Sequence, residues 1–597
     1  MLLVWRSDDS SYGGLTIPST REATGRAALV ARTAWRINDG FDRYNQDFRR
    51  ITARAKKRFV ARDWKGQMAD IARRVELYEQ WAQRTVKHLH TDLGDQITDH
   101  KLWEAVREYF GRRIEDIPDA GFAKTFYNSI TRRVFGTRGV DTAVEFIQPP
   151  PEEGITSLTM RCYPCWGDLD AVCAALLEDF KLSQRHYAES EQAAGYIANT
   201  IRKSTQVALT DNDCHRLEFI DTHFFQGTRA YLVGRIRTEQ KTHPIVVALC
   251  NTDAGITVDA VLTTAKQIGV IFSYTRSYYF ADPTSVVAAV QFLHDLLPRK
   301  PIDELYTVLG RLRQGKTERY RTLIKHLDKT TDAFVHAPGE PGLVQIVFTL
   351  PSFNLVFKVM RDVFRPPKTT THDDVHQSYR LVSRHDHAGR LIDTQHFRNL
   401  QLPRHRFSDK IFAELMAEAP RTVSINGDQL VFNHVYVERR VRPLNLYVRE
   451  VDEEEGIRAI LDYGRCIKDL AETNIFAGDL LLKNFGVTSS GRVVFYDYDE
   501  VLLVTDCNFF EIPEPDDDYP LMDHSMHRYV GPQDIFPEEI IRFLSMPSRL
   551  RSEFLSAHRD LLTADYWRDV KTRRLNGEVA EIVPYVRQSV AAHRIEL

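Results

Sequence analysis

A polar stretch close to residue 480 places the strongest constraint on what this chain can fold into. Asn484 stands five positions after Asp479, and Asp497 stands thirteen positions after Asn484, at the end of the apolar run of residues 493–496. Enzymes that transfer phosphoryl groups use an aspartate to orient a hydroxyl nucleophile, an asparagine five residues later to hold metal, and a metal-holding aspartate just after a strand. The spacing therefore favours a phosphoryl-transfer site over its plain alternative, a solvated loop.

The nucleotide-gripping half of such a site is predicted upstream of this stretch. Three strands are expected, over residues 333–335, 344–350 and 354–360, because apolar runs there are separated by turn-forming segments. Lys358 lies in the third strand, sixteen positions after Gly342 in the first turn. Glycines let a backbone close over phosphates, and an ammonium group pairs with phosphate oxygens. Any glycine-containing hairpin could carry such a lysine. The prediction of a nucleotide site therefore rests on the order of the features, with the hairpin and the lysine first and the Asp479, Asn484 and Asp497 spacing after them.

A strand that leads into a proline break separates the two halves. It is expected over residues 433–440, before Pro443. In a kinase the backbone that faces adenine would lie there, and the segment from Glu438 to Val441 is the candidate. A plain strand and turn is the alternative interpretation.

The length of the chain predicts more than one domain, because 597 residues exceed what one hydrophobic core supports. Residues 1–27 are polar and lack periodicity, so a loose N-terminal extension is expected. Residues 28–330 are predicted to form a mostly helical regulatory or docking domain with a small antiparallel β insertion at about residues 216–262. Residues 331–597 would form the catalytic domain. The expected fold class is α+β, with a bilobal protein-kinase-like domain after the helical one.

Helical periodicity is clearest after Asp63. Apolar side chains recur there in steps of three and four from Trp64 to Leu89, which indicates a helix with one buried face. Further helices are expected over residues 101–135, 169–199, 282–296 and 303–327.

Composition argues against several other classes of protein. A net charge of −3 gives no basic field of the kind that binds nucleic acid. No apolar run reaches the ~18 residues that cross a bilayer, and the first apolar residues meet Arg6 too early for a signal peptide. We therefore expect a cytoplasmic protein with no membrane partner. Seven cysteines in this length form no disulfide framework, and Cys162 and Cys165 lack the second ligand pair of a zinc site.

Several longer strings resemble the bacterial isocitrate dehydrogenase kinase/phosphatase family. They are Leu-Pro-Ser-Phe-Asn-Leu-Val-Phe-Lys-Val at residues 350–359, Tyr-Val-Glu-Arg-Arg at 436–440, Pro-Leu-Asn-Leu-Tyr at 443–447, Gly-Asp-Leu-Leu-Leu-Lys-Asn-Phe-Gly-Val at 478–487 and Arg-Val-Val-Phe-Tyr-Asp-Tyr-Asp-Glu at 492–500. The resemblance extends from about Trp35 to near the C-terminus, and its strings are long enough to be specific.

The resemblance implies a bifunctional enzyme. Members phosphorylate a serine in the active site of NADP-dependent isocitrate dehydrogenase and also remove that phosphate, which shifts isocitrate between the tricarboxylic acid cycle and the glyoxylate bypass. The implied cofactors are ATP/ADP with Mg²⁺ or Mn²⁺, used at one nucleotide site for both reactions, and AMP is the implied allosteric effector. Isocitrate dehydrogenase is the implied protein partner, and a homodimer is a candidate assembly.

The resemblance also assigns site residues. Its nucleotide contacts map to Lys358 and to the seven residues of the first turn, Ala337, Pro338, Gly339, Glu340, Pro341, Gly342 and Leu343. It assigns an active-site aspartate to Asp393, which lies too early in the chain for a catalytic loop. From the chain order, Asp393 is expected near the helix after the lysine strand, where kinases place an acidic partner for that lysine. A helix-surface carboxylate is the alternative, so we favour Asp479 as the catalytic aspartate and keep Asp393 as a candidate.

The flanks of the polar stretch depart from ordinary protein kinases. Residues 476–479 read Phe-Ala-Gly-Asp rather than His-Arg-Asp, and residues 497–499 read Asp-Tyr-Asp rather than Asp-Phe-Gly. No arginine stands beside Asp479 to bind an activation-loop phosphate, which suits an enzyme that is not switched by phosphorylation of that loop.

Each polar residue receives an expected role. Lys358 would grip ATP phosphates, Asn484 and Asp497 would hold the metal ion, and Asp479 would accept the serine proton. Lys483 would offset charge nearby. Asp499 would share a strand face with Asp497 if the chain stays extended, so it is the candidate water-orienting base for dephosphorylation; a loop-start carboxylate is the equal alternative.

Two rival functions use the same spacing. A small-molecule phosphotransferase of the aminoglycoside or choline kinase type carries a similar motif, but a small substrate needs no large helical docking domain. A catalytically silent nucleotide-sensing module is the second rival, and the intact set of Lys358, Asp479, Asn484 and Asp497 argues against it.

Overall fold

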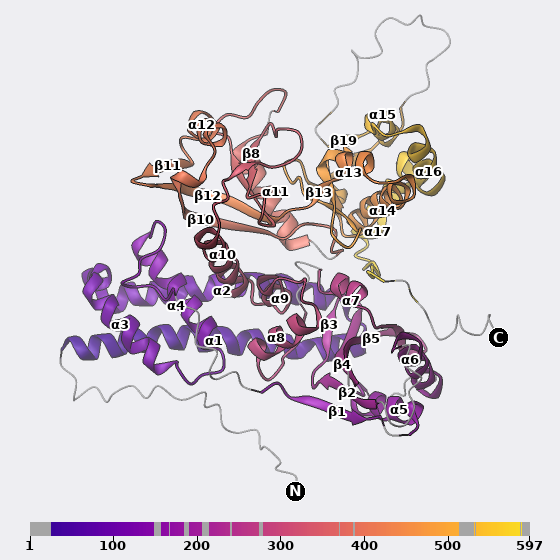
Figure 1. Ribbon diagram of the computed structural model, residues 1–597, viewed down its shortest axis with the longest axis horizontal. Coiled ribbons are helices and arrows are strands. Elements are labelled where there is room, and N and C mark those ends of the chain that lie inside the picture. Colours follow the sequence, from indigo (N-terminus) through magenta and orange to yellow (C-terminus); the bar gives the residue numbers. More distant parts are fainter. Residues whose placement is uncertain are drawn as a thin grey trace, which may run out of the picture. The chain divides into compact units, whose positions relative to one another are not determined.

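The computed structural model describes residues 25–147, 157–165, 167–183, 190–205, 214–238, 241–273, 279–368, 370–385, 388–512, 531, 533–585 and 587 (Figure 1). Residues 1–24, most of the expected N-terminal extension, lie outside this description. The chain divides into two compact units. The first comprises Met1–Arg54, Ala72–Thr159 and Asp282–Leu293, and the second comprises Ala55–Ile71, Met160–Ala281 and His294–Leu597.

The first unit is helical and is organised around an aromatic core. Its helices, some of which continue into the second unit, are α1 (Arg26–Ala61), α2 (Trp64–Leu93), α3 (His100–Arg113), α4 (Ala120–Phe135) and α8 (Val286–Leu296), with a 3₁₀ turn η1 (Gly94–Thr98). Tyr44 of α1 packs edge-on against Tyr78 of α2 and Phe122 of α4, with ring centroids 5.3 and 5.7 Å apart. The predicted apolar stripe of α2 is confirmed as a buried face, because Ile71, Tyr78, Ala82 and Leu89 are all buried.

An antiparallel sheet opens the second unit. Its strands are β1 (Met160–Pro164), β2 (Cys214–Ile220), β3 (Phe224–Gln226), β4 (Arg229–Thr238), β5 (Thr242–Thr252) and β6 (Gly255–Leu262), in the order β1-β2-β4-β5-β6 with β3 beside β4. The predicted meander is thus confirmed and is larger than expected. Helices α5 (Leu169–Asp179), α6 (Ser190–Thr205) and α7 (Ala265–Ile271) accompany it.

The prediction of one helix over residues 101–135 is wrong, because α3 and α4 are separate there, and so is the prediction of one helix over residues 303–327. In the latter range the structure has two helices, α9 (Ile302–Val308) and α10 (Leu312–Lys329), separated at Gly310. Gly310 has a φ of +83°, a left-handed conformation that glycine adopts without steric cost and that ends the first helix. A glycine inside an otherwise continuous helical pattern could have indicated this break.

A second sheet contains the strand with Lys358. Its order is β10-β12-β9-β8-β7 with β11 beside β12, and all its pairings are antiparallel. The strands are β7 (Val335–His336), β8 (Gln345–Thr349), β9 (Leu355–Met360), β10 (Thr394–Pro403), β11 (Val423–Asn426) and β12 (Gln429–Arg439), accompanied by helices α11 (His372–His385) and α12 (Asp409–Glu418). The three consecutive strands and the later strand predicted from the sequence are confirmed.

The remainder of the second unit is built on helices and very short strands. The helices are α13 (Leu444–Glu450), α14 (Glu453–Glu472), α15 (Ile540–Phe543), α16 (Ser548–His558) and α17 (Ala564–Leu575). The strands are β13 (Arg442–Pro443), β14 (Ile475–Phe476), β15 (Phe485–Val487), β16 (Val493–Phe495), β17 (Leu502–Leu503), β18 (Asn508–Phe509) and β19 (Asp534–Ile535). Tyr463 of α14 and Trp567 of α17 are fully buried in its core, which holds the short strands in place.

The fold class is therefore a mixture of helix and sheet, with a largely helical first unit and a sheet-rich part after residue 331. Among the described residues, no helix is both long enough and apolar enough to cross a membrane.

Candidate active site

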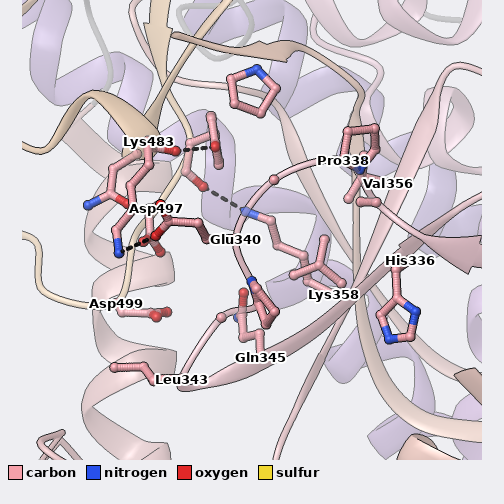
Figure 2. Close-up of a pocket in the computed structure, with 18 of the residues that line it drawn as sticks. His336, Pro338, Glu340, Leu343, Gln345, Val356, Lys358, Lys483, Asp497 and Asp499 are labelled. Carbon is pink, nitrogen blue, oxygen red and sulfur yellow. Dashed lines mark hydrogen bonds and ion pairs between the residues drawn. The ribbon is translucent and has the colours of Figure 1, made fainter. Parts of the chain in front are cut away.

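One cavity of about 820 Å³ collects almost all the site residues predicted from the sequence (Figure 2). Its lining includes Ala337, Pro338, Gly339, Glu340, Pro341, Gly342, Leu343, Lys358, Glu438, Asp479, Lys483, Asn484, Asp497 and Asp499. Asp393 alone among the predicted site residues is missing from this lining. The structure thus brings together segments that are up to 162 positions apart in the sequence, from Ala337 to Asp499.

The loop that carries Asp479 is held in one conformation by its own backbone. Gly478 has a φ of +73°, and a Cβ atom there would lie 2.2 Å from the carbonyl oxygen of Glu500, so only glycine fits. The Leu481 backbone N–H donates to Asp479 Oδ1 at 3.1 Å, and Asn484 Nδ2 donates to the Asp479 carbonyl at 3.2 Å. These bonds fix the aspartate and the asparagine relative to each other.

Asp497 lies just after β16, as predicted, with Tyr496 between the strand and the aspartate, and Asp499 lies two residues further along. Burial raises the pKa of the Asp497 carboxyl. Burial, and then the adjacent charge of Asp497, raise the pKa of the Asp499 carboxyl well above its usual value. Asp499 Oδ1 is shielded from solvent and has no hydrogen-bond partner among the described residues. Two neighbouring carboxyl groups are therefore enclosed beside the cavity without enough cationic partners.

Lys358 projects from β9 into the same cavity (Figure 2). Its Nζ lies 2.8 Å from Glu438 Oε2 and donates to the Tyr496 carbonyl at 2.6 Å. Lys358 and Glu438 are both buried, at 4% and 2% exposure. The expectation that Asp393 stands where an acidic partner of this lysine belongs is wrong, because that partner is Glu438 from β12.

Asp393 lies instead in an interior cluster of charges. The guanidinium of Arg319 in α10 spans two carboxylates, at 2.7 Å from Asp303 Oδ2 and 3.1 Å from Asp393 Oδ2. Lys300 Nζ pairs with Glu304 Oε2 at 2.8 Å beside them. All five side chains are at most 11% exposed. Sequence order placed Asp393 near the lysine, but the turn before β10 points it toward α10.

The glycine-containing turn at residues 337–343 faces the loop that carries Asp479 across the cavity. Gly339 has a φ of +128°, which a residue with a side chain rarely adopts. Glu340 Oε2 in this turn lies 3.2 Å from Lys483 Nζ in the loop that carries Asp479, and both side chains are well exposed. A solvated ion pair of this kind contributes little to stability but marks how close the two segments approach.

Lys368 and Tyr496 are among the cavity residues that the sequence reasoning missed. Lys368 forms an ion pair with Glu500, and Tyr496 supplies the carbonyl that Lys358 contacts. Lys368 stands in the irregular segment between β9 and α11, where no periodicity or motif distinguishes a functional lysine. Tyr496 precedes Asp497, and this position could have indicated that it lies in the site. In the sequence, however, its side chain continues the apolar run of residues 493–496.

The oxygen ligands needed for a divalent cation are present in this cavity. Within the described part of the chain, no three His, Cys, Asp or Glu side chains form a ready-made metal site. Magnesium, however, is commonly held by one or two carboxylates together with substrate phosphates and water. Asp497 and Asn484 offer a carboxylate and an amide oxygen, and the unpartnered oxygen of Asp499 adds to the negative charge. The donor set therefore fits a phosphate-bound hard cation.

Comparison with known proteins shows the family of the chain. Residues 34–331 match the regulatory domain and residues 332–587 match the kinase domain of isocitrate dehydrogenase kinase/phosphatase (AceK). Proteins named isocitrate dehydrogenase kinase/phosphatase are similar over nearly the whole chain. The protein of Anaeromyxobacter sp. (strain Fw109-5) is 42% identical over 97% of this chain and 100% of its own length.

Two further relatives with the same name give similar values. The protein of Anaeromyxobacter dehalogenans (strain 2CP-C) is 41% identical over 95% of this chain and 99% of its own length. That of Xanthomonas axonopodis pv. citri (strain 306) is 41% identical over 95% of this chain and 98% of its own length. With both family domains matched in order and relatives aligned from end to end, the chain belongs to the isocitrate dehydrogenase kinase/phosphatase family.

Proposed function

We propose that this protein phosphorylates and dephosphorylates a serine of isocitrate dehydrogenase, and so controls flux between the tricarboxylic acid cycle and the glyoxylate bypass. The observation that carries the proposal is the convergence of Lys358, Asp479, Asn484 and Asp497 on one cavity in a chain of this family. In this proposal the part after residue 331 is a bilobal, kinase-like catalytic domain, with the second sheet in one lobe and α13–α17 in the other.

In the kinase direction the chain's own groups bind and orient the reactants. The turn at residues 337–343 closes over the phosphates of ATP, and Lys358 pairs with their oxygens. Asn484 and Asp497 would hold Mg²⁺ or Mn²⁺, which when bound supplies charge neutralisation at the phosphate oxygens. Asp479 orients the serine hydroxyl and accepts its proton. Catalysis comes mainly from positioning and from neutralising charge.

In the phosphatase direction a water molecule must be oriented toward the phosphoserine in the same cavity. Asp499 is the proposed orienting base, because its Oδ1 atom is enclosed and lacks a hydrogen-bond partner among the described residues. Asp393 takes no direct part in either reaction in this proposal, because it stands outside the cavity lining.

The proposal includes AMP as an allosteric effector that favours the phosphatase. The decisive experiment incubates the protein with γ-labelled ATP and purified isocitrate dehydrogenase, with and without AMP. Label should enter a serine of the dehydrogenase, and AMP should speed its release. Transfer instead to an aminoglycoside or choline would favour the small-molecule phosphotransferase alternative, and ATP binding without turnover would favour a nucleotide sensor.

A further inference from the structure

The register of the second sheet places three polar side chains on the face toward the cavity. Lys358 is opposite Tyr436, and Glu438 is opposite Thr394. Because residues 436 and 438 of β12 point to the same face, Glu438 is the diagonal neighbour of Lys358 on the next strand. Long side chains reach each other across such a diagonal, as the 2.8 Å ion pair confirms.

The second carboxylate oxygen of Glu438 is also held. The Thr394 hydroxyl donates to Glu438 Oε1 at 2.7 Å, while Oε2 faces Lys358 Nζ. Thr394 is 6% exposed, so this bond is shielded from competing water. A threonine, a glutamate and a lysine thus form a chain of contacts that runs across three adjacent strands and ends in the cavity.

Helix α11, which follows the lysine strand, supplies no carboxylate to Lys358. The only acidic residues of α11 are Asp373 and Asp374. Both are exposed in its first turn, where Asp374 accepts from the Thr371 hydroxyl. The helix packs on the sheet by a different contact, since Tyr379 stacks on Tyr436 with ring centroids 3.9 Å apart.

We propose that Glu438 is the positioning residue for Lys358 during phosphoryl transfer, that Thr394 fixes the orientation of its carboxylate, and that α11 contributes no charge to this alignment. The inference rests on the proposed function and deepens it. Protein kinases take the corresponding carboxylate from a mobile helix. Here it comes from the strand beside the lysine, so the alignment is built into the sheet and survives displacement of α11.

The test measures kcat and KM for ATP in transfer to isocitrate dehydrogenase by Glu438→Gln and Thr394→Val. Glutamine keeps the size of the side chain and removes its charge, so kcat should fall by ~10²-fold through misplacement of the ammonium group. Thr394→Val removes one hydrogen bond to a charged group, so kcat should fall by ~10-fold. The KM for ATP should change by less than ~3-fold in both, since binding outside the reacting centre is kept. Thr394→Ser, which restores the hydroxyl, should recover most of the lost rate.

Asp373→Asn in α11 is the matched control and should leave kcat unchanged. Rates are expressed per folded molecule after thermal unfolding of each variant, and if Glu438→Gln does not fold, the comparison of Thr394→Val with Thr394→Ser decides. An unchanged kcat in Glu438→Gln, or equal rates in the Val and Ser variants, would overturn the inference. So would a loss in Asp373→Asn as large as that in Glu438→Gln.

ATP hydrolysis without protein substrate, measured on the same variants, separates this inference from the proposed function. If the wild type transfers nothing to isocitrate dehydrogenase, the proposed function fails, yet slower ATP hydrolysis by Glu438→Gln would still support the positioning role. A wild type that neither transfers phosphate nor hydrolyses ATP would overturn both.

Discussion

Two groups of buried charged side chains lie beside strands β10 and β12. They differ in how many cations they contain relative to carboxylates. The interior cluster contains Lys300, Asp303, Glu304, Arg319 and Asp393, and Arg439 pairs with Glu304 from its edge at 3.2 Å. Its three cations therefore face three carboxylates, and Asp393 is the only predicted site residue found there. A cluster with matched charges holds segments together and needs nothing from solution.

The pocket cluster has the opposite character. It contains Lys358, Glu438, Asp497 and Asp499, so one ammonium group faces three carboxylates at the edge of the cavity. Lys368, a further cation in the cavity lining, is itself paired with Glu500. Burial raises the pKa of both aspartates, and it also raises the pKa of Asp303 in the interior cluster. An excess of enclosed carboxylates is typical of a site that receives a cation. The pocket cluster thus differs from the interior cluster in its charge balance rather than in its burial.

The largest effect on activity is expected for a substitution in the cavity. Asp479→Ala removes the proposed proton acceptor, and phosphate transfer to isocitrate dehydrogenase should fall by ~10²–10⁴-fold. ATP binding, measured by calorimetry, should persist because Lys358 and the turn at residues 337–343 remain. Transfer at more than a tenth of the wild-type rate would remove Asp479 from the catalytic role.

A stability loss is expected on the interior side. Arg319→Met leaves Asp303 and Asp393 without their shared cation, and the free energy of unfolding should fall by about 3–5 kcal/mol in denaturant titrations. The control is Arg458→Met, because Arg458 is 60% exposed and pairs with the exposed Glu454. Its cost should be below ~1 kcal/mol. Equal costs in the two variants would contradict the distinction between the clusters.

Asp499→Ala should slow dephosphorylation more than phosphorylation. Dephosphorylation of phosphorylated isocitrate dehydrogenase should fall by ~10²-fold through loss of the water-orienting carboxylate, and phosphorylation should fall by much less. Both rates are measured on one preparation. Equal losses in the two assays would place Asp499 among the residues shared by both directions.

The smallest effect is expected for the exposed pair across the cavity. Glu340→Gln breaks the ion pair with Lys483, and the free energy of unfolding should change by less than ~1 kcal/mol. The KM for ATP should stay within ~3-fold of wild type, since a solvent-screened pair holds the turn only weakly. A change in KM of tenfold or more would mean that the pair closes the turn over the nucleotide.

Much of the site could be predicted from the sequence because its signals are local. The spacing of Asp479, Asn484 and Asp497 reflects one loop and one short hairpin, and Lys358 lies in a strand with a clear apolar pattern. Asp499 stands two residues after Asp497, so its place in the cavity lining could be expected once Asp497 was assigned to the site. The helix over residues 303–327 failed because a single glycine, Gly310, ends a helix only in some contexts.

What could not be predicted depends on strand register and on contacts between distant segments. Glu438 was expected to offer its backbone, but β12 lies between β10 and β9 in the sheet and its register directs the carboxylate to Lys358. Asp393 sits one residue before β10, so a small turn decides whether it faces the cavity or Arg319. No pattern in one sequence reports such pairings.

Asp497→Asn, assayed in both directions on purified isocitrate dehydrogenase, tests whether the two reactions share one site. We propose that the one cavity lined by Lys358, Asp479 and Asp497 performs both phosphate addition and phosphate removal. Phosphorylation with γ-labelled ATP and release of label from the phosphorylated dehydrogenase should be lost together, while the variant unfolds at the wild-type temperature. Retention of either reaction at the wild-type rate would contradict this proposal, because the two activities would then belong to different sites.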